Sequence, residues 1–145
     1  MPQHQGSIAL SRPTDEVFRQ LAQPAQRKRW LLGEPDYIPL SLGEFGEGTR
    51  WREQLSLPSG RIEYELVVRT LAAPQRLRFS VYAERFEGEQ SFELSETPYP
   101  RLDYVIHFVE ARFSDRLLRW VKGDSELCQL WIESLARLGE EESSR

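Results

Sequence analysis

The sequence is poor in the residue types that form disulfides and metal sites. It has one cysteine and two histidines among 145 residues. A lone Cys128 allows no internal disulfide, so nothing favours secretion, and a buried unreactive thiol is the simplest interpretation. His4 and His107 are far apart in the chain, and His107 alternates with the apolar residues of its segment, which predicts an exposed position. We therefore expect no metal and no other cofactor.

Long apolar runs and basic clusters are also scarce. No stretch approaches the roughly 20 apolar residues of a membrane-spanning helix, and the first ten residues lack the charged-then-apolar order of a signal peptide. The net charge is −4, whereas nucleic-acid binding needs a basic face. These features predict a cytoplasmic protein that neither inserts into membranes nor binds nucleic acid. The one basic cluster, at 27–29, is interpreted as the solvated side of a short helix, with an anion contact as the alternative.

What the chain does contain is typical of a globular protein. Hydrophobic residues make up 39% and charged residues 29% of the sequence. This length and composition predict a single domain over residues 1–145, with its core at about 7–138 and frayed ends at 1–6 and 139–145. The apolar run at 7–11 predicts a first strand.

Two short helices should follow this strand. Pro13 is suited to a first helical turn, and Asp15 and Glu16 complement the positive end of a helix. A second helix is expected from Ala25 to Leu32, since Gly33 can end it.

The hydrophobic period then changes from helical to two. Between residues 37 and 108, six segments alternate apolar residues with charged or small polar ones, and short turns separate them. This predicts an antiparallel meander with one dry and one wet face. From 113 to 138 apolar residues recur every three or four positions, which predicts a long amphipathic helix that covers the dry face.

Three stretches resemble a known superfamily. They are SRPTDEVFRQLAQPAQRKRWL at 11–31, LGEFGEGTRWRE at 42–53 and LCQLWIESLARL at 127–138. Their order resembles the polyketide cyclase/dehydrase-like branch of the START and Bet v 1-like (SRPBCC) superfamily. The resemblance implies an α+β helix-grip fold, in which a curved seven-stranded antiparallel sheet wraps a long C-terminal helix. It also implies a cavity between sheet and helix that holds lipids, sterols, polyketides or other apolar molecules.

The presumed inward-facing residues suit such a cavity because many are aromatic. Large flat side chains with few polar groups favour a ligand pocket, although simple filling of the core is the alternative for each of them. The expected ligand-binding residues are Trp51, Glu53, Leu55, Tyr64, Leu66, Phe79, Gln90, Phe92, Tyr104, Trp120 and Trp131.

Glu53 is the candidate for chemistry. In RWREQLSL it shares the side of Trp51 and Leu55, where a carboxylate is costly unless it is paired or hydrogen-bonded. One interpretation gives it a structural or rim salt-bridged role, since a strand end or bulge can turn it outward and Arg50 and Arg52 are near in sequence. The other leaves it inside the cavity, as a candidate general acid or base.

Three functions follow from these observations. The first is a protein that binds a small apolar or amphipathic molecule, as a monomer or a homodimer. The second is an enzyme of the cyclase or aromatase type, in which Glu53, Gln90 and a tyrosine hydroxyl handle protons. The third is a protein-interaction module with a filled core and an exposed apolar patch.

Overall fold

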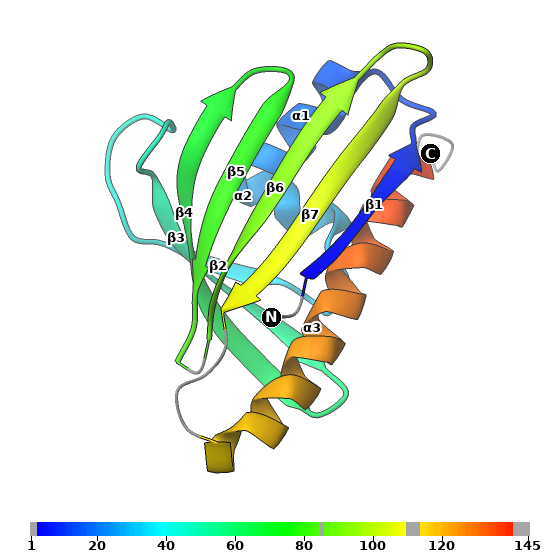
Figure 1. Ribbon diagram of the computed structural model, residues 1–145. Coiled ribbons are helices and arrows are strands. Elements are labelled where there is room, and N and C mark those ends of the chain that lie inside the picture. Colours follow the sequence, from blue (N-terminus) through cyan, green and yellow to red (C-terminus); the bar gives the residue numbers. More distant parts are fainter. Residues whose placement is uncertain (1–2, 85, 110–113, 141–145) are drawn as a thin grey trace.

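In the computed structural model, a curved antiparallel sheet wraps one side of a long C-terminal helix (Figure 1). The structure describes residues 3–84, 86–109 and 114–140, and for residues 3, 109 and 114–125 it describes the backbone alone. Along the chain the elements are β1 (Gln3–Ala9), α1 (Thr14–Ala22), α2 (Pro24–Trp30), β2 (Asp36–Pro39), β3 (Arg50–Leu57), β4 (Gly60–Ala72), β5 (Arg76–Tyr82), β6 (Glu87–Ser95), β7 (Arg101–Val109) and α3 (Ser114–Glu140).

The strands form one sheet in the order β1-β7-β6-β5-β4-β3-β2, and every neighbouring pair is antiparallel. The six strands from β2 to β7 are neighbours in chain order and form a meander. β1, the first strand of the chain, pairs with β7 at the edge opposite β2. With α3 packed across the inner face, this is the α+β helix-grip fold that the sequence predicts (Figure 1).

Several boundaries differ from the sequence-based prediction. α3 continues to Glu140, so residues 139 and 140 are not frayed. β1 begins at Gln3, whose main chain pairs with that of His107, so residues 3–6 are not frayed. α2 ends at Trp30, two residues early.

The alternation of Tyr37, Ile38, Leu40 and Leu42 predicts a strand as far as Leu42, but β2 stops at Pro39. The missing N–H of this proline suits an edge strand.

Burial along β3 and β6 follows the predicted period of two, whereas β4 and β5 each contain a run of three buried residues. In β3 every second residue from Trp51 to Leu57 is buried, and the residues between them are partly exposed. β4 contains an irregularity between Val68 and Thr70, where the register with β5 shifts. Such a bulge bends a strand and strengthens its twist, which helps this 13-residue strand to curve around α3.

Hydrogen bonds hold α3 across the inner face at two widely separated places. Near its C-terminal end, the main-chain N–H and the hydroxyl of Ser11 both donate to the carbonyl oxygen of Gly139, at 3.0 and 2.9 Å. Further toward its N-terminal half, Glu126 accepts a 2.5 Å hydrogen bond from the hydroxyl of Ser59 in the turn between β3 and β4. The helix therefore reaches from the β1 edge to the β3–β4 hairpin, and the sheet and helix together enclose the core.

Candidate binding site on the inner face of the sheet

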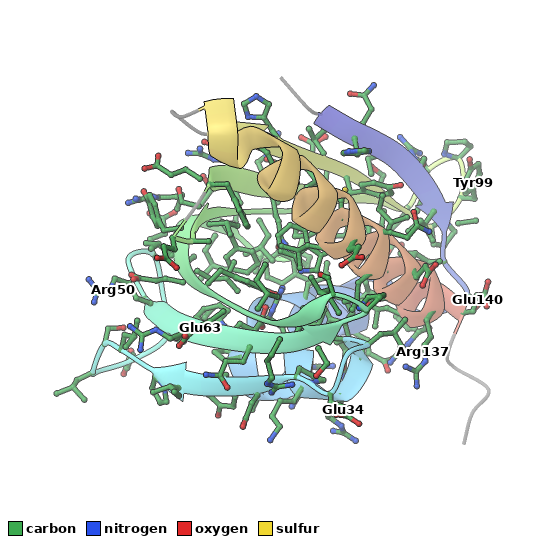
Figure 2. All side chains as sticks on the ribbon, turned by 90° about the horizontal axis from the view of Figure 1, so that it is seen from below. Glu34, Arg50, Glu63, Tyr99, Arg137 and Glu140 are labelled. Atoms are coloured by element: carbon green, nitrogen blue, oxygen red, sulfur yellow. The ribbon has the colours of Figure 1, made fainter. Side chains whose placement is uncertain are left out.

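The predicted site residues gather in the layer between the sheet and α3. Side chains fill this layer in Figure 2, while the labelled Arg50 and Arg137 point away from it. Ten of the eleven predicted residues have described side chains, and none of these is more than 9% exposed. Trp120 belongs to the part of α3 described by its backbone alone. The ten are Trp51, Glu53, Leu55, Tyr64, Leu66, Phe79, Gln90, Phe92, Tyr104 and Trp131.

Aromatic rings pack against one another along two lines on this face. In the first, Trp131 of α3 stacks on Phe108 at 5.8 Å and meets the edge of Tyr64 at 5.5 Å. In the second, Phe79 receives Trp51 at 5.5 Å and Phe92 at 6.3 Å, both nearly perpendicular to it. Edge-to-face contacts at these distances are favourable arrangements for aromatic pairs. Two groups of contacting aromatic rings therefore belong to the inner face.

A chain of polar side chains crosses this aromatic layer. Arg27 of α2 donates to both carboxylate oxygens of Glu53, through Nε at 2.8 Å and Nη2 at 3.0 Å. The hydroxyl of Tyr64 donates to Glu53 Oε1 at 2.7 Å, and the indole N–H of Trp131 donates to that hydroxyl at 3.1 Å. Four side chains from α2, β3, β4 and α3 are thereby joined in one buried network.

Burial and charge determine which group of this network carries a proton. Burial raises the pKa of Tyr64 well above 10, and the neighbouring Glu53 charge raises it further. The phenol is therefore a neutral donor to the carboxylate. For Arg27, burial acts to lower the pKa, but the charge of Glu53 and the hydrogen bonds outweigh it, so the pKa is raised. Arg27 and Glu53 form an ion pair that is neutral as a unit.

The structure decides between the two interpretations of Glu53. Its side chain is 2% exposed and faces inward, as the alternation predicts, so the rim interpretation is wrong. Arg50 and Arg52 pair instead with Glu65 and Glu63.

The prediction for the basic cluster is wrong at one position. Arg27 is 1% exposed, whereas Lys28 and Arg29 are exposed as predicted. Its guanidinium lies between the rings of Trp30 and Phe79, at 5.4 and 5.3 Å. The sequence did hold a signal for this, because a residue three positions before Trp30 shares its helical face.

Two further polar atoms on the inner face have no such partner. Trp51 Nε1 and Gln90 Oε1 are buried, and neither has a hydrogen-bonding partner among the residues that the structure describes. Their side chains are 1% and 2% exposed. Both residues neighbour Phe79: Trp51 packs on its ring, and Gln90 is directly opposite it in the β5–β6 register.

Tyr104 occupies a different part of the same face. Its phenol lies against Gly6 of β1, where a Cβ would come within 2.6 Å of the hydroxyl oxygen. Burial, together with the neighbouring Cys128, raises the pKa of Tyr104. The tyrosine hydroxyls of the predicted site therefore do not all act together, since only that of Tyr64 joins Glu53.

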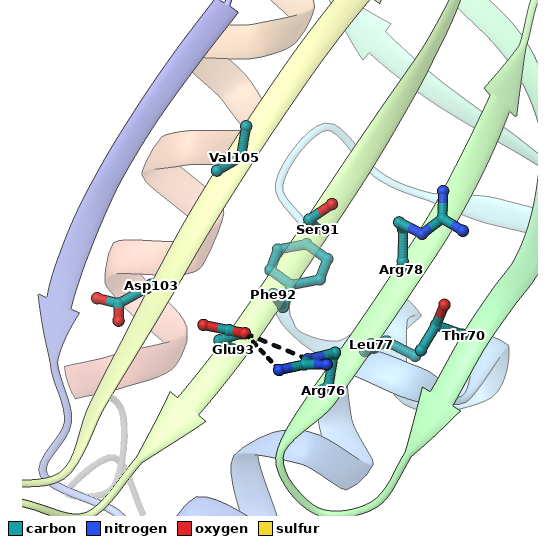
Figure 3. A pocket seen from close by; sticks show the side chains of 9 residues that line it. All are labelled: Thr70, Arg76, Leu77, Arg78, Ser91, Phe92, Glu93, Asp103 and Val105. Atoms are coloured by element: carbon teal, nitrogen blue, oxygen red, sulfur yellow. Dashed lines mark hydrogen bonds and ion pairs between the residues drawn. The ribbon is translucent and has the colours of Figure 1, made fainter.

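The outer face of the sheet carries a separate groove of about 310 Å³ (Figure 3). Its charged side chains have ion-pair partners: Arg76 lies 3.0 Å from Glu93 within the groove, and Arg78 lies 3.2 Å from Glu89 beside it. Asp103 pairs with Arg101 at 3.3 Å. The sequence did not predict this groove. Its lining residues come from four strands, β4 to β7, and the pairing of those strands decides which side chains lie next to one another. It is lined by Thr70, Arg76, Leu77, Arg78, Ser91, Phe92, Glu93, Asp103 and Val105.

Neither a metal cluster nor a membrane span is found in the part of the chain that the structure describes. No three His, Cys, Asp or Glu side chains there are grouped so as to hold a metal ion. None of the described helices is long and apolar enough to cross a membrane.

Comparisons with known proteins support the fold. No family model and no curated protein matches the sequence. Among solved structures, protein CV1439 from Chromobacterium violaceum superimposes with a TM-score of 0.71 at 14% identity, covering 96% of both chains. Mll3558 from Rhizobium loti gives 0.65 at 19% identity, over 94% of this chain and 96% of that one. A protein from Arthrobacter aurescens gives 0.67 at 16% identity, over 94% and 84%. At these identities the likeness shows the fold alone.

Proposed function

We propose that this protein binds a small, largely apolar molecule between the inner face of its sheet and α3. One observation carries the proposal: Trp51 Nε1 and Gln90 Oε1 are buried polar atoms without a partner among the described residues. Leaving a buried polar group unsatisfied costs about 1–3 kcal/mol. A bound molecule that satisfies both atoms removes this cost, which makes their retention on one face understandable.

The surroundings of these two atoms fit an apolar ligand body. Phe79 packs on Trp51 and is paired with Gln90 in the sheet, and Leu66 and Ile106 are fully buried on β4 and β7. Removing apolar surface from water contributes about 25 cal/mol per Å², from which the costs of association are subtracted. Most of the affinity would therefore come from the ligand body, and the polar atoms would fix its orientation.

The helix-grip fold gives further support. The sequence resembles the SRPBCC superfamily, and we propose that the chain is related to it. That resemblance implies a ligand between sheet and C-terminal helix, which is where the two unpartnered atoms lie.

The geometry favours binding over proton transfer at Glu53. Its two oxygens already accept three hydrogen bonds, from Arg27 twice and from Tyr64. Its charge is matched by Arg27 at 2.8 Å. A general base needs a lone pair that can reach the substrate, so we assign Glu53 a structural role rather than a catalytic one. The cyclase-type alternative stays a prediction.

A pair of neighbouring substitutions tests where the ligand binds. Ile106 faces inward directly opposite Gln90, and Val105 faces outward into the groove of Figure 3. We would titrate the wild type, Ile106→Phe and Val105→Phe with the fluorescent apolar probe N-phenyl-1-naphthylamine, after circular dichroism has confirmed folding.

The proposal expects saturable binding that Ile106→Phe weakens by about tenfold or more, because a ring beside Gln90 occupies the space of the ligand. Val105→Phe should bind like the wild type. The opposite pattern would assign binding to the outer groove, and an absence of saturable binding to the wild type would contradict the proposal.

A further inference from the structure

The two edges of the sheet differ in the main-chain groups that they offer to another strand. β2 forms one edge and β1 the other (Figure 1). In an antiparallel pair, the N–H and C=O groups of every second residue point to the neighbouring strand, and those of the residues between them point away. At an edge, the groups that point away can pair with a further strand.

The β2 edge offers no N–H group to such a strand. The Leu40 N–H donates to the carbonyl oxygen of Arg50, so the alternation makes Tyr37 and Pro39 the residues of β2 whose groups point away from β3. The Tyr37 N–H already donates to Asp36 Oδ1 at 3.2 Å, and a proline has no N–H. A short strand with a charge and a proline is a common way to protect an edge.

The β1 edge lacks this protection. The Leu10 N–H donates to the carbonyl oxygen of Pro100 at 3.0 Å, in the same register that pairs β1 with β7. The groups of Ser7 and Ala9 therefore point away from β7, to the open edge of β1. None of the described strands pairs with this open edge, and no described residue accepts a hydrogen bond from the N–H of Ser7 or Ala9.

The end of α3 limits the length of the open edge. The Ser11 N–H donates to the carbonyl oxygen of Gly139, and a Cβ on Gly139 would lie 3.4 Å from the carbonyl oxygen of Ala9. The helix therefore borders the edge at Ala9, and the open stretch lies on the N-terminal side of that residue.

The composition of this strand suits a second copy of itself. β1 has the sequence QHQGSIA, which contains no Asp, Glu, Lys, Arg or Pro. A two-fold axis brings identical segments together, so a charged residue near the axis would meet its own charge. Each copy carries a net charge of −4, yet β1 itself adds nothing to the repulsion.

Gly6 is the centre of the pairing that these groups allow. When Gly6 is opposite Gly6 of the second copy, Ser7 of each strand is opposite the other strand's Gln5, and the outward groups of both strands meet. The two glycines then form a non-hydrogen-bonded pair, in which the Cα atoms approach to about 4.5 Å. Each Gly6 is already covered by the Tyr104 phenol of its own copy, whose oxygen would lie 2.6 Å from a Cβ there.

We propose that two copies of this protein associate through β1, in an antiparallel two-fold pairing that is centred on Gly6 and joins both sheets into one. The partner is a second copy of this chain. The proposal does not depend on the ligand-binding function.

The mass of the protein and the exchange of single amides test the pairing. Edge pairing buries a small area, so we expect association at micromolar concentrations, and we would compare samples of about 5 and 500 µM by sedimentation and by hydrogen exchange. The mass should double in the concentrated sample. The amides of Ser7 and Ala9 should exchange about fivefold more slowly there, while those of Gly6 and Ile8, which point to β7, should be protected in both samples.

The register has a separate readout. In a mixture of isotope-labelled and unlabelled copies, an intermolecular nuclear Overhauser effect should connect the α-protons of the two Gly6 residues, because such protons face each other in a non-hydrogen-bonded pair. A dimer without this contact would contradict the centre at Gly6.

Charged variants test the interface without removing a main-chain group. Gln5→Lys with Ser7→Lys places like charges opposite each other across the axis, while the new charge at position 7 lies beside Asp103 of its own sheet. Leu42→Lys with Gln75→Lys is the matched control, because both positions are exposed and the net charge changes equally. The first pair should weaken association by about tenfold or more, and the control should stay within about twofold.

A complementary variant restores the interaction. Copies with Gln5→Glu and Ser7→Glu should not pair with themselves, but they should form a mixed dimer with the lysine variant, which native mass spectrometry detects. Circular dichroism confirms that each variant is folded.

Three results would overturn the proposal. The first is a protein that stays monomeric at about 500 µM. The second is a dimer that the lysine variant leaves intact, or in which the Ser7 and Ala9 amides exchange as fast as in the dilute sample, since another surface would then be the interface. The third is a monomer with these two amides protected at both concentrations, which would show that the edge is covered within one copy.

Discussion

Arg27 and Glu53 are joined by two hydrogen bonds of 2.8 and 3.0 Å in a place where neither side chain is more than 2% exposed. Arg27 belongs to the second helix and Glu53 to the third strand, so the pair connects α2 with the sheet. Through Tyr64 the connection continues to Trp131 of α3. The network therefore fixes both helices on the inner face beside the proposed site.

Removing one charge of this pair should be strongly destabilising. In Glu53→Gln the guanidinium of Arg27 stays buried without its counter-charge, and such losses cost about 3–5 kcal/mol. Glu63→Gln is the matched control, because Glu63 pairs with Arg52 at 3.3 Å while both side chains are 42–48% exposed. The control should cost less than about 1 kcal/mol. Urea unfolding followed by circular dichroism measures both, and equal losses in the two variants would contradict this assignment.

Replacing three of the four network residues, Arg27, Glu53 and Tyr64, by apolar residues should recover most of that loss. In the triple variant Arg27→Met, Glu53→Leu, Tyr64→Phe no buried charge remains, and such replacements are often neutral or stabilising. We expect its free energy of unfolding to exceed that of Glu53→Gln by at least about 2 kcal/mol. A triple variant as unstable as Glu53→Gln would show that packing, rather than the unpaired charge, causes the loss.

Tyr64 should make the protein sensitive to alkaline pH. Its pKa in the folded protein is well above the ordinary 10 of the unfolded chain, because of burial and then the Glu53 charge. Below pH 10 both states hold the proton, and the contribution of Tyr64 to stability is fully present. Above pH 10 only the unfolded chain loses it, so the free energy of unfolding falls, by up to about 1.4 kcal/mol per pH unit.

Urea unfolding at pH 8, 9, 10 and 11 measures this slope. Tyr64→Phe should have a shallower fall above pH 10 than the wild type, although it is less stable at pH 8. The control Tyr99→Phe, at a position 50% exposed, should keep the slope of the wild type. An unchanged slope in Tyr64→Phe would show that other groups cause the alkaline loss.

Gly88 should not tolerate a side chain. A Cβ at this position of β6 would overlap the main-chain carbonyl oxygen of His107 on β7 and lie 3.2 Å from Phe108. Overpacking against a backbone typically costs about 1–3 kcal/mol, and we expect this loss for Gly88→Ala. Gly46→Ala is the matched control, because nothing lies within 4 Å of a Cβ there, and its change should stay within about 0.5 kcal/mol. Thermal unfolding compares the two, and a neutral Gly88→Ala would contradict this packing.

The sequence predicted most of the fold because its signals are local. A strict period of two places Glu53 on the side of Trp51 and Leu55, and the structure confirms that all three are buried. The partner of Glu53 could not be predicted, since Arg27 is 26 residues away in the sequence, on a separate helix. Its position depends on how α2 packs on the sheet, and no residue pattern within β3 encodes that.

β1 illustrates a second limit. Its first residues, from Gln3 to Gly6, carry no apolar alternation, and they are a strand because their main chain pairs with β7. Hydrophobic periodicity detects burial of side chains and cannot detect main-chain pairing at an edge. The sequence also could not predict that Trp51 Nε1 and Gln90 Oε1 lack hydrogen-bonding partners among the described residues. That depends on the tertiary packing of every element around them, because any neighbouring side chain or main chain could have supplied a partner.

The claim that a ligand binds between the inner face of the sheet and α3 is tested most directly by locating a bound probe. We would saturate isotope-labelled protein with N-phenyl-1-naphthylamine and measure nuclear Overhauser effects between probe and protein. The account predicts contacts to Leu66, Phe79 and Ile106 on the inner face. Contacts to Thr70 and Val105 in the outer groove instead would contradict it.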